Sequence, residues 1–259
     1  MPQLGLGVWQ AKDGEEVKNA IHWALDTGYR HIDTARIYKN EEGVGAAIAS
    51  ASTPRDQIFL TTKVWNDDIR AGRAAAAIDE SLTRLRTDYV DLLLLHWPVK
   101  GSPAAWRDLE AAQRAGKCRA IGLSNFMPEQ MDEILSVAEI TPAINQIEYH
   151  PYLTQQDAAA ACAAHGILLT AWSPLMQGHF KDEALFTEIG EKHGKSAAQV
   201  VLRWGLQRGV IVIPKSTNQG RIQQNFDLFD FELNTEEMDQ INALEKGHRF
   251  GPDPRNFDF

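Results

Sequence analysis

The sequence predicts an α/β protein that folds as a single (β/α)8 TIM barrel of 259 residues. Eight short, β-rich apolar runs alternate in a constant order with longer, Ala-rich amphipathic stretches, and this alternation is typical of a parallel sheet. The length fits as well, because closed α/β barrels commonly form one unit of about 250 residues. No linker rich in Gly, Ser or Pro divides the chain, so we expect one domain over residues 1–259.

The runs predicted as strands are rich in β-branched and large apolar residues. They are Leu4–Val8, Arg30–Thr34, Ile58–Val64, Val90–His96, Arg119–Leu123, Ala143–Glu148, Ile167–Trp172 and Val210–Pro214. The amphipathic stretches predict helices over Gly14–Thr27, Glu41–Ala51, Arg73–Arg86, Pro103–Ala115, Pro128–Ala138, Gln155–His165, Glu183–His193, Ser196–Gln207, Gly220–Phe226 and Thr235–Leu244. Pro103 and Pro128 suit the first turn of a helix, and Gly28, Gly116 and Gly166 suit the position after a helix end.

Composition narrows the range of partners and of cell compartments. The chain has 26 Lys and Arg against 35 Asp and Glu, a formal net charge of −9, and it has no basic tract. That balance argues against general nucleic-acid binding, which needs clustered Lys and Arg to neutralise phosphates. No apolar window approaches the roughly 18 residues of a membrane span, and the N-terminus lacks the pattern of a signal peptide. We therefore expect a cytoplasmic protein without membrane partners.

Metal and disulfide chemistry are not expected either. The two cysteines, Cys118 and Cys162, are too few for a disulfide scaffold and too isolated for a zinc site. His31, His150 and His165 have no neighbouring residues that would complete a metal site. Two cysteines without a disulfide framework fit a reducing cytosol.

Chemistry in a (β/α)8 barrel takes place at the C-terminal ends of the strands, so reactive residues should follow each run. Polar or aromatic residues stand at all eight ends: Trp9, Asp33 with Tyr38, Lys63 with Trp65, His96 with Trp97, Ser124 with Asn125, Gln146, Trp172 with Ser173, and Lys215 with Ser216. If the barrel closes, these side chains converge on one mouth.

Four of these residues together suggest a proton donor aimed at a carbonyl group. An ammonium beside a tyrosine favours its phenolate, so we expect Lys63, oriented by Asp33, to lower the pKa of Tyr38. A neutral His96 could donate a hydrogen bond to the carbonyl oxygen. Each residue alone has a plainer interpretation, since a single Lys is most often solvated and a single His or Tyr is most often packed in the core. Their joint placement favours the functional interpretation.

The motifs at these positions resemble those of the aldo-keto reductase family, most closely its bacterial 2,5-diketo-D-gluconate reductase branch. They cover nearly the whole chain in the right order and spacing: GYRHIDTARIYKNEEGVGAAI (28–48), FLTTKVWND (59–67), DLLLLHWP (91–98), IGLSNF (121–126), INQIEYHP (144–151), WSPLMQG (172–178) and IPKS (213–216). The resemblance implies a barrel reductase that uses NADPH without a Rossmann domain.

The resemblance also assigns roles to individual residues. Asp33, Tyr38, Lys63 and His96 match the family's catalytic tetrad, with Tyr38 as the general acid. The residues that match nicotinamide contacts are Ser124, Asn125 and Gln146, with Trp172 at the stacking position, and those that match pyrophosphate contacts are Ser173, Leu175, Gln177 and Gly178. The segment PKSTNQGRIQQN (214–225) resembles the adenosine 2′-phosphate site and implies contacts from Lys215, Ser216, Arg221, Gln224 and Asn225. A helix N-terminus beside two cations suits a phosphate, although two basic residues could also be merely solvated.

Aromatic residues at the strand ends indicate where a substrate would bind. Trp9, Trp65 and Trp97 predict an apolar rim, and the segment Arg249–Phe259 would lie over it if it resembles the family's specificity tail. The branch implies small carbonyl substrates such as 2,5-diketo-D-gluconate, methylglyoxal, diketones and β-keto esters. The family resemblance also implies a monomer. Because the chain starts at MPQLGLGVW, we expect it to lack the short N-terminal hairpin with which family barrels normally open.

Two alternatives come from other functional classes. One is an NADPH-binding sensor or regulatory protein on the same fold with negligible turnover, against which the complete tetrad argues. The other is a barrel hydrolase or isomerase, which would need paired carboxylates or a metal site at the strand ends. The sequence offers neither, so NADPH-dependent carbonyl reduction is the favoured prediction.

Overall fold

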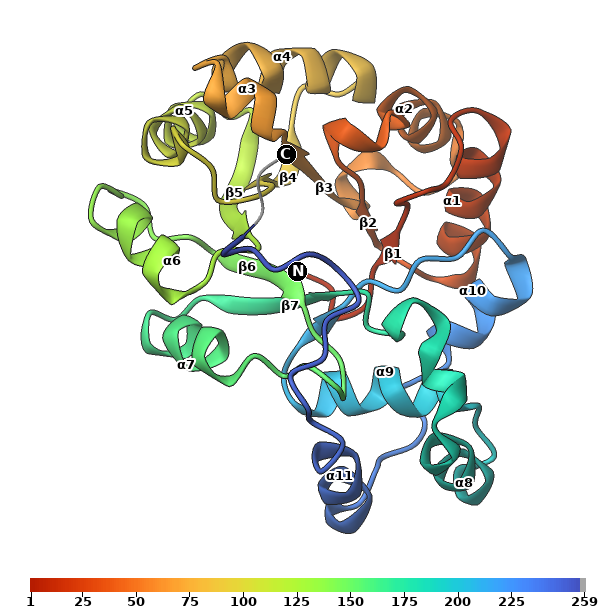
Figure 1. Ribbon diagram of the computed structural model, residues 1–259. Helices are drawn as coiled ribbons and strands as arrows, with labels where there is room; N and C mark the ends of the chain where they lie inside the picture. The colour runs from red at the N-terminus through yellow and green to blue at the C-terminus, as the bar shows by residue number, and fades with distance from the viewer. Residues whose placement is uncertain (257–259) are drawn as a thin grey trace.

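The computed structural model, which describes residues 1–256, is a (β/α)8 barrel, and it confirms the predicted fold class. Each strand pairs in parallel with the next along the chain, and helices form a ring around the sheet (Figure 1). The strands are β1 (Leu6–Gly7), β2 (His31–Asp33), β3 (Phe59–Val64), β4 (Val90–Leu95), β5 (Cys118–Ser124), β6 (Ile144–Glu148), β7 (Leu168–Trp172) and β8 (Ile211–Val212).

Backbone hydrogen bonds between β8 and the N-terminal segment close the barrel. The N–H of Gly5 donates to the carbonyl of Val212 at 2.9 Å, and the N–H of Val212 donates to the carbonyl of Gln3 at 3.0 Å. Leu4 also forms a parallel bridge with Val212. The first residues of the chain therefore lead directly into the barrel wall.

Helices cover the outside of the sheet. They are α1 (Glu15–Thr27), α2 (Glu41–Ser50), α3 (Asn66–Arg70), α4 (Ala74–Leu85), α5 (Ser102–Arg114), α6 (Pro128–Leu135), α7 (Gln156–Ala164), α8 (Ala184–His193), α9 (Ala197–Gln207), α10 (Gln219–Phe226) and α11 (Thr235–Asn242). Three 3₁₀ segments complete the chain: η1 (Arg36–Tyr38), η2 (Arg55–Gln57) and η3 (Met176–Asp182). The predicted helices are all present, within a few residues of the expected ends.

Short elements are the ones that the sequence analysis does not predict. The five-residue helix α3 and the segments η1 and η3 all follow strand ends, in stretches to which the sequence assigns neither a strand nor a helix. Helices this short are not stable by themselves. They also contain too few residues for a repeated hydrophobic pattern to be recognised in the sequence. Local bonds such as those from the N–H groups of Asp68 and Ile69 to the carbonyl of Trp65 hold α3.

The apolar core has two parts, as a closed parallel sheet requires. Inside the barrel, Leu92, Leu94 and Ile144 form a small separate cluster. Between strands and helices lies a much larger cluster, which includes the fully buried side chains of Trp106 and Trp204. Strand β4 is buried on both faces, which explains its unbroken Leu run.

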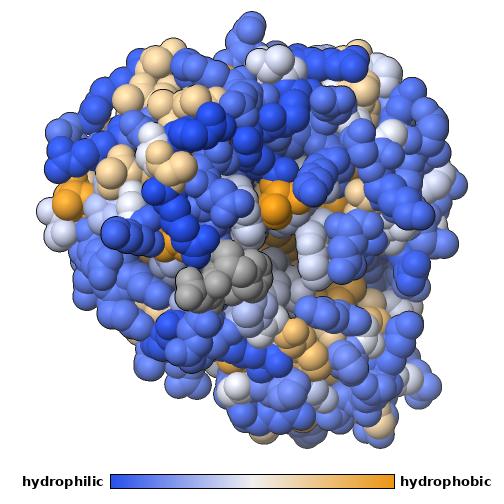
Figure 2. Space-filling model, turned by 45° about the horizontal axis from the view of Figure 1, so that its top comes forward, coloured by the Kyte–Doolittle hydropathy of each residue, from blue (hydrophilic) through white to orange (hydrophobic). Residues whose placement is uncertain are grey.

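Polar residues dominate the surface that Figure 2 shows, where hydrophobic residues form only small separate groups. That face has no large apolar patch of the kind that marks an obligate interface. Among residues 1–256, no helix is both long enough and apolar enough to span a bilayer. Within the same range, no three His, Cys, Asp or Glu side chains gather in a way that could hold a metal ion.

The packing of α2 against α4 predicts opposite effects for the same substitution at two helical glycines. A Cβ at Gly45 would lie 2.6 Å from the backbone carbonyl of Leu85, so Gly45→Ala should destabilise the protein by about 1–3 kcal/mol. Gly220 in α10 is exposed, and its nearest neighbour would be the Asn218 side chain at 3.5 Å. Gly220→Ala should therefore be neutral or stabilising by up to about 1 kcal/mol. Urea unfolding measures both, and equal effects would contradict this packing.

Candidate active site

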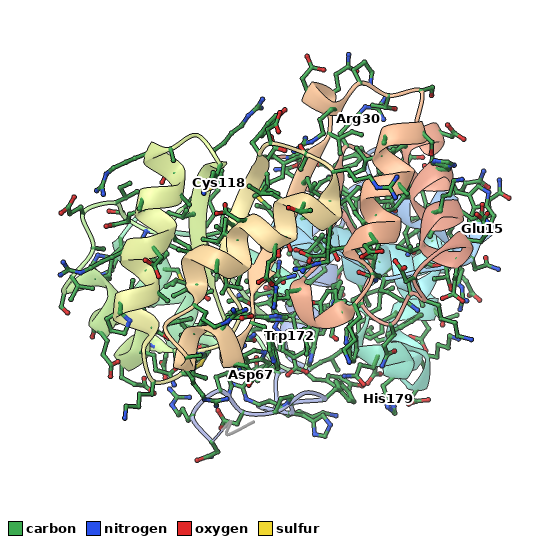
Figure 3. The ribbon with its side chains drawn as sticks, turned by 90° about the horizontal axis from the view of Figure 1, so that it is seen from above. Glu15, Arg30, Asp67, Cys118, Trp172 and His179 are labelled. Carbon is green, nitrogen blue, oxygen red and sulfur yellow. The ribbon has the colours of Figure 1, made fainter. Side chains whose placement is uncertain are left out.

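The C-terminal ends of the strands surround one cavity of about 990 Å³. In Figure 3, Arg30 and Cys118, at the starts of two strands, lie at one end of the barrel, and Trp172 lies near the other end with Asp67 and His179. The chain after α11 crosses the barrel at this second end. The structure thus brings the strand-end residues together at one mouth, as the sequence predicts.

A buried ion pair lies beneath the cavity. The ammonium of Lys63, whose side chain is fully buried, donates to Asp33 Oδ1 at 2.6 Å and to the carbonyl of Thr34 at 2.9 Å. A third contact, to Tyr38 Oη, measures 3.4 Å. Each of the three N–H donors of the Lys63 ammonium therefore has a partner, and one of these partners is the phenol that lines the cavity.

Local structure explains how these side chains meet. Asp33 is the last residue of β2, and the turn η1 that follows brings Tyr38 back over the mouth. Lys63 lies two residues beyond Thr61, the partner of Asp33 in the register of β2 and β3. His96 follows β4, and its ring lies edge-on to that of Tyr38 with centroids 5.7 Å apart. Three consecutive strands and the segments that follow them thus contribute to one cluster.

Burial adds an influence on the pKa of Tyr38 that the sequence does not show. Burial raises the pKa of Tyr38 above the ordinary value of 10.0, and the Lys63 ammonium only offsets part of that rise. The predicted influence of Lys63 is confirmed in direction, but removal from water disfavours the phenolate more than the ammonium favours it. Tyr38 is therefore held as a protonated phenol, which is the form that a proton donor needs.

Burial and neighbouring charges also set the charges of Lys63 and His96. Burial by itself would lower the pKa of Lys63, but the charge of Asp33 and the contacts of the ammonium with Asp33 and Tyr38 together outweigh burial, so the pKa is raised and the ammonium stays charged. Burial and, secondly, the charge of Lys63 hold the pKa of His96 well below 6.5. His96 Nδ1 is buried without a hydrogen-bond partner. The cluster combines a permanent cation with a neutral imidazole and a neutral phenol.

The predicted nicotinamide contacts connect directly to this cluster. Gln146 Nε2 donates to Asp33 Oδ2 at 2.7 Å, so it holds the carboxylate oxygen that Lys63 does not. Asn125 Nδ2 donates to the carbonyl of His96 at 3.0 Å, and Asn125 Oδ1 accepts the indole N–H of Trp172 at 2.7 Å. Asn125 has a φ of 66°, an uncommon backbone conformation that turns its amide toward both partners.

All the predicted site residues except the fully buried Lys63 line the same cavity. At the mouth these are Trp9, Asp33, Tyr38, Trp65, His96, Trp97, Ser124, Asn125, Gln146 and Trp172. Along the cavity they continue with Ser173, Leu175, Gln177, Gly178, Lys215, Ser216, Arg221, Gln224 and Asn225. Their roles toward a cofactor stay predictions.

Several lining residues are not among those predicted. Ile37 faces the cavity from η1, and Ser196, Ala197 and Ala198 face it from the start of α9. The Ser196 hydroxyl accepts the N–H of Gln199, which forms a capping box that fixes this end of the helix. The spacing of Ser196 and Gln199 predicts the helix start, but only the fold shows that it borders the cavity. The last residues of the predicted tail, 257–259, lie outside the described residues.

Two parts of the cavity wall differ in charge. The tetrad lies at one part of this wall, while Lys215 and Arg221 lie at another, beside the start of α10. Both of these cations are exposed, and among residues 1–256 neither forms a salt bridge. Asn218 caps α10 by accepting the N–H of Arg221 at 3.0 Å. A phosphate placed there would meet two positive charges near a helix N-terminus.

Comparison with known proteins identifies close relatives over the whole chain. The model of the Aldo/keto reductase family matches residues 3–246. A glyoxal reductase of Bacillus subtilis is 51% identical over 98% of this chain and 92% of its own length. The crystal structure of a protein provisionally named 2,5-diketo-D-gluconic acid reductase B is 43% identical with a TM-score of 0.93, covering 98% of this chain and 92% of that one.

A structure with a bound cofactor is also similar. An aldo-keto reductase of Bombyx mori in complex with NADP is 39% identical, has a TM-score of 0.88, and covers 96% of this chain and 91% of that one.

Burial of His96 predicts that its imidazole stays neutral well below pH 6.5. Because the pKa is lowered, the neutral form persists as the pH falls through the ordinary histidine range. In ¹H–¹⁵N NMR spectra, the His96 ring signals should stay constant from about pH 8 to about pH 5.5, while a solvated histidine titrates in that interval. Titration of His96 near pH 6.5 would contradict this account of the site.

Proposed function

Because the chain belongs to the aldo/keto reductase family, as the match over residues 3–246 shows, we propose that it is an NADPH-dependent reductase of small carbonyl compounds. Membership in the family supports an oxidoreductase that reduces carbonyl groups. The observation that carries the proposal furthest is the buried contact chain from Asp33 through Lys63 to Tyr38 at the wall of the cavity. The NADP bound to the Bombyx mori relative supports the cofactor.

The residues of the site have distinct tasks in the proposed reaction. NADPH, when bound, supplies a hydride from its nicotinamide ring to the carbonyl carbon. Tyr38 donates its phenolic proton to the carbonyl oxygen, and the Lys63 ammonium stabilises the phenolate that remains. Asp33 keeps Lys63 charged and in place. The neutral His96 imidazole can orient the carbonyl oxygen through an N–H hydrogen bond.

Residues in the cavity wall can each be assigned to one part of the cofactor. Ser124, Asn125 and Gln146 would hold the carboxamide of the nicotinamide, and the ring of Trp172, fixed by Asn125, would stack on it. The pyrophosphate would contact Ser173, Leu175, Gln177 and Gly178. Lys215, Ser216 and Arg221 would bind the 2′-phosphate, with Gln224 and Asn225 near the adenine.

The charge of the wall favours uncharged substrates over sugar acids. Among the described residues, the lining cations Lys181, Lys215 and Arg221 all follow β7 or β8. The wall after β1 to β4 presents Trp9, Ile37, Trp65 and Trp97 instead. A carboxylated substrate such as 2,5-diketo-D-gluconate would find no counter-ion on that apolar wall. Glyoxal, methylglyoxal and small neutral diketones are therefore the preferred substrates in this proposal.

The two alternative functions, a barrel hydrolase or isomerase and an NADPH sensor, have less support. Within residues 1–256, Asp33 is the one carboxylate that lines the cavity, so the paired acids of a barrel hydrolase are missing from it. An NADPH sensor would need the same cofactor contacts but no proton donor, whereas Tyr38 is supported by two buried charged residues. A cytoplasmic location and a monomeric state stay predictions.

Removal of the Tyr38 hydroxyl tests the proton donor. Tyr38→Phe should lower kcat for methylglyoxal reduction by at least about 10²-fold, because the developing alkoxide loses its proton source. The Kd for NADPH should change little, since the ring is kept and the hydroxyl has no assigned contact with the cofactor. Steady-state kinetics and fluorescence titration measure the two quantities. A Phe variant as fast as the wild type would refute the assignment.

Arg221 tests the preference for NADPH. Arg221→Ala should raise the KM for NADPH by about tenfold or more, because a charge-assisted contact to the 2′-phosphate is lost. The KM for NADH, which lacks that phosphate, should change much less. Lys181→Ala serves as a control that removes another lining cation. Equal effects of Arg221→Ala on both cofactors would rule out the 2′-phosphate role.

A further inference from the structure

The chain after α11 crosses the mouth of the barrel and contacts elements far from it in sequence (Figures 1 and 3). We call residues 247–256 the C-terminal tail. Gly251 and Pro252 of this tail line the cavity. The side chain of Gln130 in α6 donates to the carbonyl of Pro254 at 3.2 Å, and Arg255 pairs with Glu129 at 2.8 Å. The tail is thus fixed on the side of α6 by contacts at its far end.

A buried carboxylate holds the middle of the tail. Glu148, the last residue of β6, is fully buried and accepts the N–H of Phe250 at 2.7 Å and the N–H of Gly251 at 3.2 Å. Gly251 lies against the ring of Trp172, where a Cβ would come within 2.3 Å of the indole. Glu148 therefore fixes the backbone of the tail directly over the mouth.

Phe250 connects this anchored tail to η3. Its ring stacks on that of His179 with centroids 4.7 Å apart and an interplanar angle of 6°. The carbonyl of Phe250 accepts a hydrogen bond from Gln177 Nε2 at 3.4 Å. His248 packs edge-on against the same ring from within the tail, with centroids 4.7 Å apart. Phe250 is thus held by Glu148 through its N–H and holds η3 through its carbonyl and its ring.

The segment η3 forms part of the wall around the proposed cofactor. Gln177, Gly178, Phe180 and Lys181 all line the cavity. Gln177 and Gly178 have φ values of 51° and 103°, so η3 is not a regular helix that its own backbone bonds would hold. Its position therefore depends on side-chain contacts such as those of Met176 and Phe180 with the core and of His179 with Phe250.

We propose that Phe250 is a positioning residue that fastens η3 to the C-terminal tail and thereby slows the release of the bound dinucleotide. The inference rests on the proposed function, because it places the cofactor under η3. Release requires η3 to move away from the cavity, and that movement must break the stack between Phe250 and His179. The tail would then act on the cofactor as well as on the substrate side of the mouth.

The rate of NADPH dissociation, measured by stopped-flow fluorescence, tests the proposal. Phe250→Ala should release NADPH roughly three- to tenfold faster than the wild type, the range expected for loss of one aromatic stack. Phe250→Tyr keeps the stack and should restore the wild-type rate. Arg255→Ala removes a contact at the far end of the tail only, and because Glu148 still holds the backbone at Phe250, it should leave the rate unchanged.

A double-mutant cycle separates the stack from a general loosening of the tail. If Phe250 acts through His179, then His179→Ala should increase the rate as well, and the double variant should release NADPH no faster than the faster single variant. Fully additive effects, or a Phe250→Ala rate equal to the wild type, would overturn the proposal. In a wild type that binds NADPH, these outcomes test only whether Phe250 fastens η3, and they leave the proposed reductase function untouched.

Hydrogen exchange in the cofactor-free protein gives a second readout that does not depend on the proposed function. In Phe250→Ala the backbone amides of residues 176–182 should exchange faster, while those of the strands should not change. Unchanged exchange in η3 would refute the fastening even in a protein that reduces carbonyls. If the wild type does not bind NADPH, the proposed function and the role of Phe250 in cofactor release are both refuted. Faster exchange in Phe250→Ala would still show that Phe250 fastens η3.

Discussion

The buried pair of Asp33 and Lys63 is the interaction on which the rest of the site depends. Moving two charges out of water costs several kcal/mol each, and the cost is offset only if their hydrogen-bonding capacity is satisfied. Lys63 reaches Asp33, the carbonyl of Thr34 and the hydroxyl of Tyr38, and Gln146 holds the second oxygen of Asp33. The phenol at the cavity wall is therefore both a partner of the buried charge and the proposed proton donor.

The pair also explains the electrostatics around it. Burial raises the pKa of Tyr38 and lowers that of His96, and the Lys63 charge opposes the first shift and adds to the second. The result is a neutral acid beside a neutral imidazole, kept so by one cation that stays charged. The barrel fixes this arrangement because its members come from neighbouring strands of one closed sheet, whose register leaves little freedom to the side chains.

The sequence predicts most of the fold and most of the lining of the site, for identifiable reasons. Parallel strands buried on both faces and long amphipathic helices leave clear patterns, and the strand-end rule places Asp33, Tyr38 and His96 at one mouth. The net direction of the Tyr38 pKa could not be predicted, because it depends on how deeply the phenol is buried. Nor could the stack of Phe250 on His179, since it joins two irregular segments 71 positions apart whose conformations have no sequence period. The start of α9 at Ser196 was predicted, but its place beside the cavity follows only from the closed barrel.

The net charge of −9 also has a more specific meaning in the folded protein. The overall charge predicts that nucleic acids are not general partners, yet Lys215 and Arg221 stand at one part of the cavity without a salt bridge within residues 1–256. The most direct test of the central claim is NADPH consumption by the purified protein with glyoxal, methylglyoxal, a neutral diketone and 2,5-diketo-D-gluconate, with the alcohol products quantified. The account predicts one alcohol formed for each NADPH consumed, with the neutral dicarbonyls reduced faster than the sugar acid. Tight NADPH binding without turnover of any of these carbonyls would contradict it and favour a sensor.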